Sequence, residues 1–150
     1  MKKIVVLISG RGSNFVAIQE SALREDWEHS IGAKIVAVIS NRPDAKGLEL
    51  AKNYGIDALC VDHKAFETRE AFEEKLYEVV SQYEPDLIVL AGFMRILTAG
   101  FVDRFEGKIL NIHPALLPSF KGLDTHQRAI DAGVRMAQHR LSYFLPDDFP

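Results

Sequence analysis

The sequence predicts an α/β protein with a mostly parallel, doubly wound sheet that carries helices on both faces. Short apolar runs rich in β-branched residues alternate with segments of helical periodicity, and the runs lack polar alternation, as is typical of strands buried on both faces. The expected strands are 4–8, 33–40, 56–61, 87–91 and 108–113. A chain of 150 residues is long enough for one such domain with a hydrophobic core and too short for two.

The first half of the chain follows this alternation closely. A glycine-rich turn after the first strand leads into a helix expected over 15–26, and the second strand ends at Asn41. Asp44 is placed to cap the next helix, which runs to Tyr54, and Gly55 is placed to end it.

The segment 68–82 gives the clearest helical pattern. Its apolar residues fall on one face and are Phe72, Leu76, Val79, Val80 and Tyr83. The intervening charged residues are expected to form a solvated face and are Glu70, Glu73, Glu74, Lys75 and Glu78. Further along, a short helix is expected over 125–132.

Composition and charge argue against several classes of partner and chemistry. A net charge of -3 gives no electrostatic reason to expect nucleic acid or an anionic membrane. The apolar run after Lys3 is too short for a signal peptide or a membrane span, so a cytoplasmic location is expected. Cys60 is the only cysteine, and within its apolar run we expect a buried structural thiol. The histidines lack metal-ligand spacing, so no metal is expected.

The turn 9–14 reads Ser-Gly-Arg-Gly-Ser-Asn and opens the first helix. Its glycines allow a tight turn and the close approach of a ligand, and the first N–H groups of the helix favour an anion. A dinucleotide-binding turn would place a third glycine where the chain has Phe15, and a P-loop would need a lysine at the helix start. A single phosphate of a mononucleotide or sugar phosphate fits better, and a plain tight turn is the alternative.

A second polar cluster, Asn111-Ile112-His113-Pro114, stands at the carboxyl end of the fifth strand. Alternation along the strand puts Asn111 and His113 on the same side. An amide can donate a hydrogen bond to a developing oxyanion, and an imidazole can move protons near neutral pH, which suits direct acyl transfer to an amine. The alternative is that both side chains only hold the loop in place.

Three segments in this order resemble the phosphoribosylglycinamide formyltransferases. They are residues 4–14 (IVVLISGRGSN), 91–97 (AGFMRIL) and 111–122 (NIHPALLPSFKG), and the end of the second strand at 38–42 (VISNR) is similar as well. The resemblance covers about residues 1–134. It implies a Rossmann-like formyltransferase fold and formyl transfer from 10-formyltetrahydrofolate to the amine of glycinamide ribonucleotide in purine biosynthesis, by a monomer or weak homodimer.

The resemblance also implies three groups of site residues. The substrate phosphate would be held by Gly12, Ser13 and Asn14. The folate pocket would be formed by Met94, Arg95, Ile96 and Leu97, with the backbone of Leu97 facing the pterin and Arg69 near the folate tail. The catalytic residues would be Asn111 and His113, with no metal.

The chain departs from the family pattern after Val134. The family continues with a strand and a loop whose aspartate orients His113, whereas residues 135–150 read RMAQHRLSYFLPDDFP. We therefore divide the chain into a nucleotide-binding and catalytic domain, 1–134, and an atypical tail, 135–150. The fold is expected to be incomplete at its C-terminus and the activity to be impaired.

Alternatives to this function stay open. A formyltetrahydrofolate deformylase hands the formyl group to water and needs no phosphate cradle such as Gly12-Ser13-Asn14. A non-catalytic phosphate or nucleotide-binding module would fit if the altered tail abolishes the chemistry. Formylation of initiator methionyl-tRNA is disfavoured by the acidic net charge, and an NADP-dependent oxidoreductase would rest on Arg42 alone.

Overall fold

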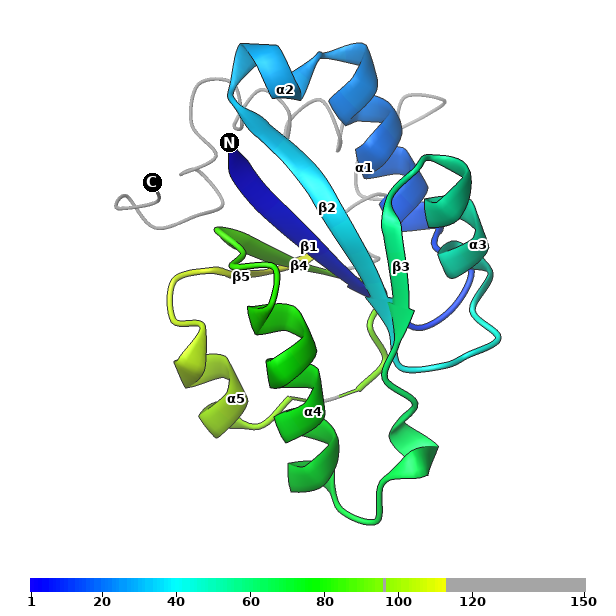
Figure 1. Cartoon of the computed structure of the whole chain (residues 1–150), viewed down its shortest axis with the longest axis vertical. Helices are drawn as coiled ribbons and strands as arrows, with labels where there is room; N and C mark the ends of the chain where they lie inside the picture. The colour runs from blue at the N-terminus through cyan, green and yellow to red at the C-terminus, as the bar shows by residue number, and fades with distance from the viewer. Residues whose placement is uncertain (96, 113–150) are drawn as a thin grey trace.

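The computed structural model describes residues 1–95 and 97–112 and contains a five-stranded parallel sheet with helices on both faces (Figure 1). The strands are β1 (Lys2–Ile8), β2 (Ala33–Ser40), β3 (Asp57–Cys60), β4 (Leu87–Ala91) and β5 (Ile109–Ile112). They lie in the order β3-β2-β1-β4-β5, so among the described residues β1 is central and β3 and β5 are the outermost strands. The predicted α/β class and all five predicted strands are confirmed.

The helices divide between the two faces of the sheet, as a doubly wound fold requires. Helices α1 (Ser13–Arg24), α2 (Trp27–Ser30) and α3 (Lys46–Asn53) cover one face, and α4 (Arg69–Ser81) and α5 (Ala99–Arg104) cover the other (Figure 1). A short 3-10 helix, η1 (His63–Ala65), precedes α4.

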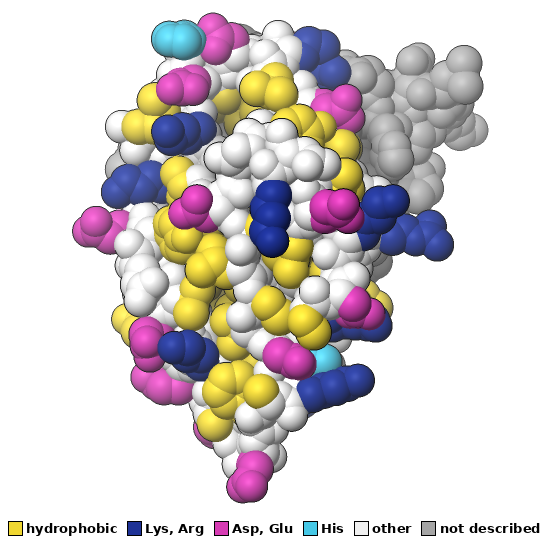
Figure 2. All heavy atoms as spheres, turned by 45° about the vertical axis from the view of Figure 1, so that its right-hand side comes forward, with side chains coloured by type: hydrophobic (Ala, Val, Ile, Leu, Met, Phe, Trp, Pro, Cys, Tyr) yellow, Lys and Arg dark blue, Asp and Glu magenta, His cyan; other side chains and the backbone are white. Residues whose placement is uncertain are grey.

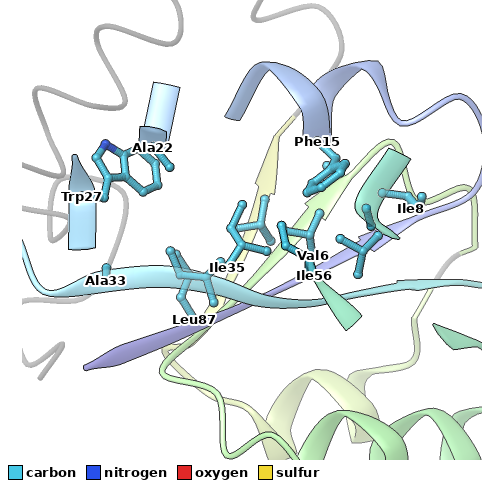
Figure 3. Packing of buried hydrophobic residues seen from close by; sticks show 14 of the residues in the cluster. Val6, Ile8, Phe15, Ala22, Trp27, Ala33, Ile35, Ile56 and Leu87 are labelled. Atoms are coloured by element: carbon cyan, nitrogen blue, oxygen red, sulfur yellow. The ribbon is translucent and has the colours of Figure 1, made fainter. Parts of the chain in front are cut away.

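The face under α1 explains why position 15 carries phenylalanine. Phe15 is fully buried and lies over Val6 and Ile8 of β1, with Ala22 and Trp27 further along the same layer (Figure 3). A third glycine in a dinucleotide-binding turn would bring the helix close to the strand. Here the aromatic ring fills that space, and its burial stabilises the fold by about 1.5–3 kcal/mol.

The opposite face confirms the apolar stripe predicted for α4. Phe72, Leu76, Val79 and Val80 pack with the β1 residues that point away from α1, which are Val5 and Leu7. Phe101 and Phe105 join this layer from α5 and its C-terminal end. The sequence analysis did not predict α5, because six residues are too short to establish a helical period.

Two local predictions about helix ends in the first half are wrong. The helix expected over 15–26 ends at Arg24, and a separate short helix follows because Asp26 adopts a left-handed conformation with φ of 49°. Asp44 does not cap α3, whose N-cap is Ala45 without a side-chain hydrogen bond. Asp44 instead pairs with Arg42, with 3.4 Å between Oδ1 and Nε.

Two predictions about exposure are also wrong. Cys60 is exposed rather than buried, because β3 is an edge strand and does not form the double-sided core that its apolar composition suggested. Glu73 is 7% exposed and does not belong to the solvated face of α4, because its carboxylate bonds Thr98.

Other predictions lie outside the described residues. These are the helix expected over 125–132 and the separate tail 135–150. Within the described part of the chain, none of the helices has the length and apolar character needed to cross a membrane.

Candidate functional site

The carboxyl ends of β1 and β4 form the point where the chain leaves the sheet in opposite directions. After β1 it crosses to the face covered by α1, and after β4 it crosses to the face covered by α5. In open parallel sheets this divergence creates the crevice where ligands bind. The loops 9–14 and 91–98, both expected from the sequence, therefore lie side by side, and the Met94 N–H joins them by donating to Ser9 Oγ at 2.7 Å.

The predicted phosphate loop ends in a helix start that carries no side-chain cap. Gly12 is the N-cap of α1, with φ of 77°, and as a glycine it supplies no side-chain cap hydrogen bond to the first turn. Ser13 is exposed and Asn14 half-buried at the start of the helix. The first N–H groups of α1 and the positive end of its dipole lie at this turn, where the sequence predicts an anion.

Gly47 is a component of this loop that the sequence analysis missed. Its N–H donates to the Gly10 carbonyl at 3.1 Å, and a Cβ at Gly12 would lie 2.6 Å from the Gly47 Cα. A Cβ at Gly47 would clash with the side chain of Ile8. Both glycines are therefore needed for the loop to lie against the start of α3. A glycine inside a predicted helix was the available signal, because it destabilises a helix unless something approaches closely.

Buried polar side chains connect the loops after β1 and β2. Ser9 and Asn41 are 2% and 3% exposed, and the Ser9 hydroxyl donates to Asn41 Oδ1 at 2.5 Å. His63 Nδ1 lies 3.0 Å from the Asn41 carbonyl oxygen and 3.1 Å from Asn41 Nδ2, so η1 is tied to the same network. His63 was expected on an exposed loop and is instead half-buried. Such a network limits the freedom of the loops at this end of the sheet.

The segment expected to meet folate has one very exposed apolar side chain. Met94 is 78% exposed, whereas Arg95 and Leu97 are half-buried, and Leu97 packs against the layer that contains Leu7 and Phe72. Ile96 lies outside the described residues. An exposed methionine next to polar groups is a common feature of adaptable ligand-binding surfaces.

Helix α4 approaches the same segment from the second face of the sheet. Glu73 Oε2 accepts from the Thr98 N–H at 2.8 Å, and Glu73 Oε1 accepts from the Thr98 hydroxyl at 2.5 Å. Arg69 is exposed at the first residue of α4, four residues before Glu73. One helical turn is about 5.4 Å long, so Arg69 lies roughly one turn from the anchor of the segment.

Asn111 stands at the carboxyl end of β5, where the sequence places the catalytic pair. It is exposed, and its backbone pairs with Leu90, the second-to-last residue of β4. His113 lies outside the described residues. The structure thus brings Asn111 to the carboxyl-terminal end of the sheet, where the loops 9–14 and 91–98 also lie.

Cys60 is the last residue of β3 and lies at the same carboxyl-terminal end of the sheet, but carboxylates lie nearby. Partial burial of the thiol raises its pKa, and the nearby carboxylates of Asp62 and Asp44 raise it further. The thiolate is therefore disfavoured, which argues against a nucleophilic role. Among residues 1–95 and 97–112, no group of three or more His, Cys, Asp or Glu side chains is arranged to hold a metal ion.

The surface on the β3 side of the molecule carries charges of both signs. Figure 2 shows Lys and Arg side chains interspersed with Asp and Glu on this face, with hydrophobic side chains between them. Arg42 and Asp44 form one such pair at the end of β2. An interspersed pattern creates no extended field of one sign on that face.

Three comparisons place this geometry among known proteins. The sequence profile of the family described as formyl transferase matches residues 2–139. The phosphoribosylglycinamide formyltransferase of Escherichia coli (strain K12) is 46% identical over 130 residues, which are 87% of this chain and 59% of that protein. The trifunctional purine biosynthetic protein adenosine-3 of Bos taurus is 46% identical over 132 residues, 88% of this chain and 13% of that protein.

A solved structure shares both sequence and fold with the chain. The phosphoribosylglycinamide formyltransferase from Coxiella burnetii is 46% identical and superimposes with a TM-score of 0.69, over 88% of this chain and 60% of that one. The chain thus spans about three fifths of the length of the single-function relatives.

Proposed function

The chain belongs to the formyl transferase family, and we propose that it transfers a formyl group from 10-formyltetrahydrofolate to the amine of glycinamide ribonucleotide. The observation that carries this proposal is the hydrogen bond from the Met94 N–H to Ser9 Oγ. It holds a phosphate-type loop and an exposed apolar segment side by side at the switch point of the sheet. A transfer between a phosphorylated amine and a folate needs both surfaces at once.

We assign the ribonucleotide phosphate to Gly12, Ser13 and Asn14. The start of α1 supports this assignment, because its N-cap is Gly12, which has no side chain to accept from the first N–H groups of the helix. The exposed Ser13 hydroxyl adds a further donor. Hydrolysis of formyl folate by water would not need such a cradle, which favours the transferase over the deformylase.

We assign the folate to the segment Met94, Arg95, Ile96 and Leu97, with Arg69 at its tail. The exposed side chain of Met94 offers apolar contact to an aromatic ring. Arg69 is exposed at the start of α4 and suits the carboxylates of a folate tail.

The reaction follows from the residue types at the end of β5. The amine nitrogen bonds to the formyl carbon, the tetrahedral intermediate carries an oxyanion, and the bond to the folate nitrogen breaks once a proton moves from the amine to that nitrogen. Asn111 donates a hydrogen bond to the oxyanion, and a protonated His113 stabilises it and moves the proton. The exposure of Asn111 and its place next to β4 support this role.

The wider assignments are part of the same proposal. Residues 1–134 form the nucleotide-binding and catalytic domain, with two small molecules as substrates and no resident metal. The protein works in the cytoplasm as a monomer or weak homodimer. The match of the family profile to residues 2–139 supports a single family domain over most of the chain, and it reaches five residues beyond the boundary proposed at 134.

The test is formyl transfer by this 150-residue chain, followed as the change in folate absorbance with and without glycinamide ribonucleotide. Turnover that requires the ribonucleotide is expected. Turnover that is equally fast without it would replace the transferase with a deformylase. Binding of both molecules without turnover would replace it with a non-catalytic binding module.

Substitution of the proposed proton carrier gives a second measurement. His113→Ala is expected to lower the turnover number by about 10²–10⁴-fold while leaving ribonucleotide binding intact. His29→Ala is the matched control, because His29 is exposed on α2 and bonds only to Asp26 among the described residues. A His113→Ala variant as active as the control would remove His113 from the mechanism.

A further inference from the structure

The segment between β4 and α5 has no regular structure over 92–95 and 97–98, yet its backbone is fixed at two points by side chains from distant elements. Ser9, at the end of β1, accepts from the Met94 N–H, and Glu73, in α4, accepts from the Thr98 N–H. Both anchoring residues are more than nine-tenths buried. One anchor comes from each side of the segment, and the residues between them are those assigned to folate.

The Glu73 anchor does more than complete a helix cap. At the start of α4 the cap is the side chain of Thr68, whose Oγ1 accepts from the Ala71 N–H at 3.1 Å. Helix α5 begins with Thr98, whose Oγ1 accepts from the Phe101 N–H at 3.3 Å, and here a buried carboxylate is added. A buried carboxylate costs free energy unless it is well hydrogen-bonded. The Thr98 cap does not require the Glu73 carboxylate, so the added effect of the carboxylate is to fix the Thr98 backbone next to Leu97.

The Ser9 anchor is itself oriented. Its hydroxyl proton is committed to Asn41 Oδ1, so its lone pairs are directed to the Met94 N–H. Asn41 is in turn held against His63. The backbone of Met94 is therefore fixed while its side chain is 78% exposed. A fixed backbone that presents an exposed apolar side chain is preorganised for a ligand, because less conformational entropy is lost on binding.

We propose that Ser9 and Glu73 are positioning residues, which fix the backbone at Met94 and at Thr98 for binding of the folate substrate. The proposal rests on the proposed function, since the ligand of the segment is taken from it. Neither residue touches the substrate. Each acts through the backbone N–H that it accepts.

The experiment measures binding of tetrahydrofolate and of inorganic phosphate by calorimetry, on the full chain and on Ser9→Ala and Glu73→Ala. Each variant is expected to bind tetrahydrofolate about 5–30-fold more weakly, because a half-buried backbone N–H loses its acceptor and the backbone is no longer fixed at that point. Phosphate affinity is expected to stay within about twofold, because the first turn of α1 is untouched.

Two matched variants separate positioning from general stability. Ser40→Ala removes a buried serine at the end of the neighbouring strand, whose Oγ accepts only from the nearby Arg42 N–H at 3.0 Å among the described residues. Glu74→Ala removes the next carboxylate of α4, which is exposed and pairs with Arg104. Both are expected to keep wild-type affinity for tetrahydrofolate, even where their melting temperatures match those of the test variants.

Amide hydrogen exchange gives a readout that does not depend on any ligand. Exchange at Met94 is expected to accelerate in Ser9→Ala and exchange at Thr98 in Glu73→Ala, each with little change at the other site. Glu73→Gln keeps one acceptor and is expected to recover most of the protection at Thr98.

The outcomes distinguish the positioning role of Ser9 and Glu73 from the function on which it rests. Wild-type affinity for tetrahydrofolate in Ser9→Ala and Glu73→Ala would overturn the positioning role. A wild-type chain that binds phosphate but not tetrahydrofolate would overturn the folate assignment of the proposed function, and the ligand of the positioned backbone with it. Loss of affinity in the Ser40→Ala control equal to that in Ser9→Ala would reduce Ser9 to a structural residue.

Discussion

Helices α1 and α4 begin in opposite ways on opposite faces of the sheet. Thr68 closes the start of α4 by accepting from the Ala71 N–H at 3.1 Å. Helix α1 starts after Gly12, in a left-handed conformation and without a side-chain cap. A side chain of the protein thus caps the start of α4, whereas the N-caps of α1 and α3 make no side-chain cap hydrogen bond. Helix α1 differs from α3 in its glycine-rich turn, and for this reason we propose that its start binds the phosphate.

The largest expected effect comes from a side chain at the start of α1. Gly12→Ala would force a left-handed φ of 77° on alanine and place its Cβ 2.6 Å from the Gly47 Cα. Backbone strain and overpacking together are expected to lower the free energy of unfolding by about 2–4 kcal/mol. Urea denaturation measures this loss, and phosphate binding by the folded fraction is expected to be lost as well.

Gly55 provides the matched control for that substitution. It ends α3 with φ of 75°, close to that of Gly12, and a Cβ there would meet nothing within 4 Å. Gly55→Ala is expected to lower the free energy of unfolding by about 1 kcal/mol, from strain alone, and to leave phosphate binding unchanged. Equal losses in the two variants would show that the contact between Gly12 and Gly47 has no energetic weight.

A pair of milder substitutions sharpens the same comparison. Thr68→Ala removes the cap of α4 and is expected to lower the free energy of unfolding by about 1 kcal/mol without any effect on phosphate affinity. Ser13→Ala, at the first residue of α1, is expected to change stability by less than about 0.5 kcal/mol because Ser13 is exposed, and to weaken phosphate binding. Thermal unfolding and calorimetric titration with phosphate test both. The reverse pattern would mean that Ser13 is a structural cap and that α1 has no ligand-binding role.

The sequence could predict the sheet because its central strands are buried on both faces and therefore read as continuous apolar runs. The same rule failed for Cys60, since the residues next to it are apolar in sequence but β3 is the outermost of the five described strands on its side. Periodicity alone does not reveal the order of strands in space. The spacing of apolar residues thus predicts helices and strands but does not predict which strands lie next to each other.

The site was predictable to the extent that it depends on local motifs. Gly12, Ser13 and Asn14 lie at the start of α1 as the turn sequence predicts. Glu73 was assigned to the solvated face of α4, because helical spacing gives the face of a residue but not its partner 25 positions away. Ser9 and Gly47 were missed for the same reason. Their partners lie on other loops, so the glycine inside the predicted helix could mark Gly47 as unusual but could not identify Gly10 and Gly12 as its contacts.

The smallest expected effect is on the reactivity of Cys60, which lies at the same carboxyl-terminal end of the sheet as the start of α1. The start of α1 favours a negative charge, whereas burial and the carboxylates of Asp62 and Asp44 raise the pKa of the Cys60 thiol and disfavour its anion. Alkylation by iodoacetamide at pH 7.5 is therefore expected to be slower than that of glutathione, although the residue is exposed. The rate should keep rising above the pH at which glutathione levels off.

Asp44→Asn tests the cause of that slow alkylation, because it removes one of the two neighbouring charges and preserves the shape of the side chain. The variant is expected to react faster than the unmodified chain, with the pH profile moved to lower pH. If Cys60 instead reacted as fast as glutathione in the unmodified chain, the local field at the end of β3 would not be the one inferred from its carboxylates. The contrast between the start of α1, which favours an anion, and the end of β3, which disfavours one, would then depend on the α1 dipole alone.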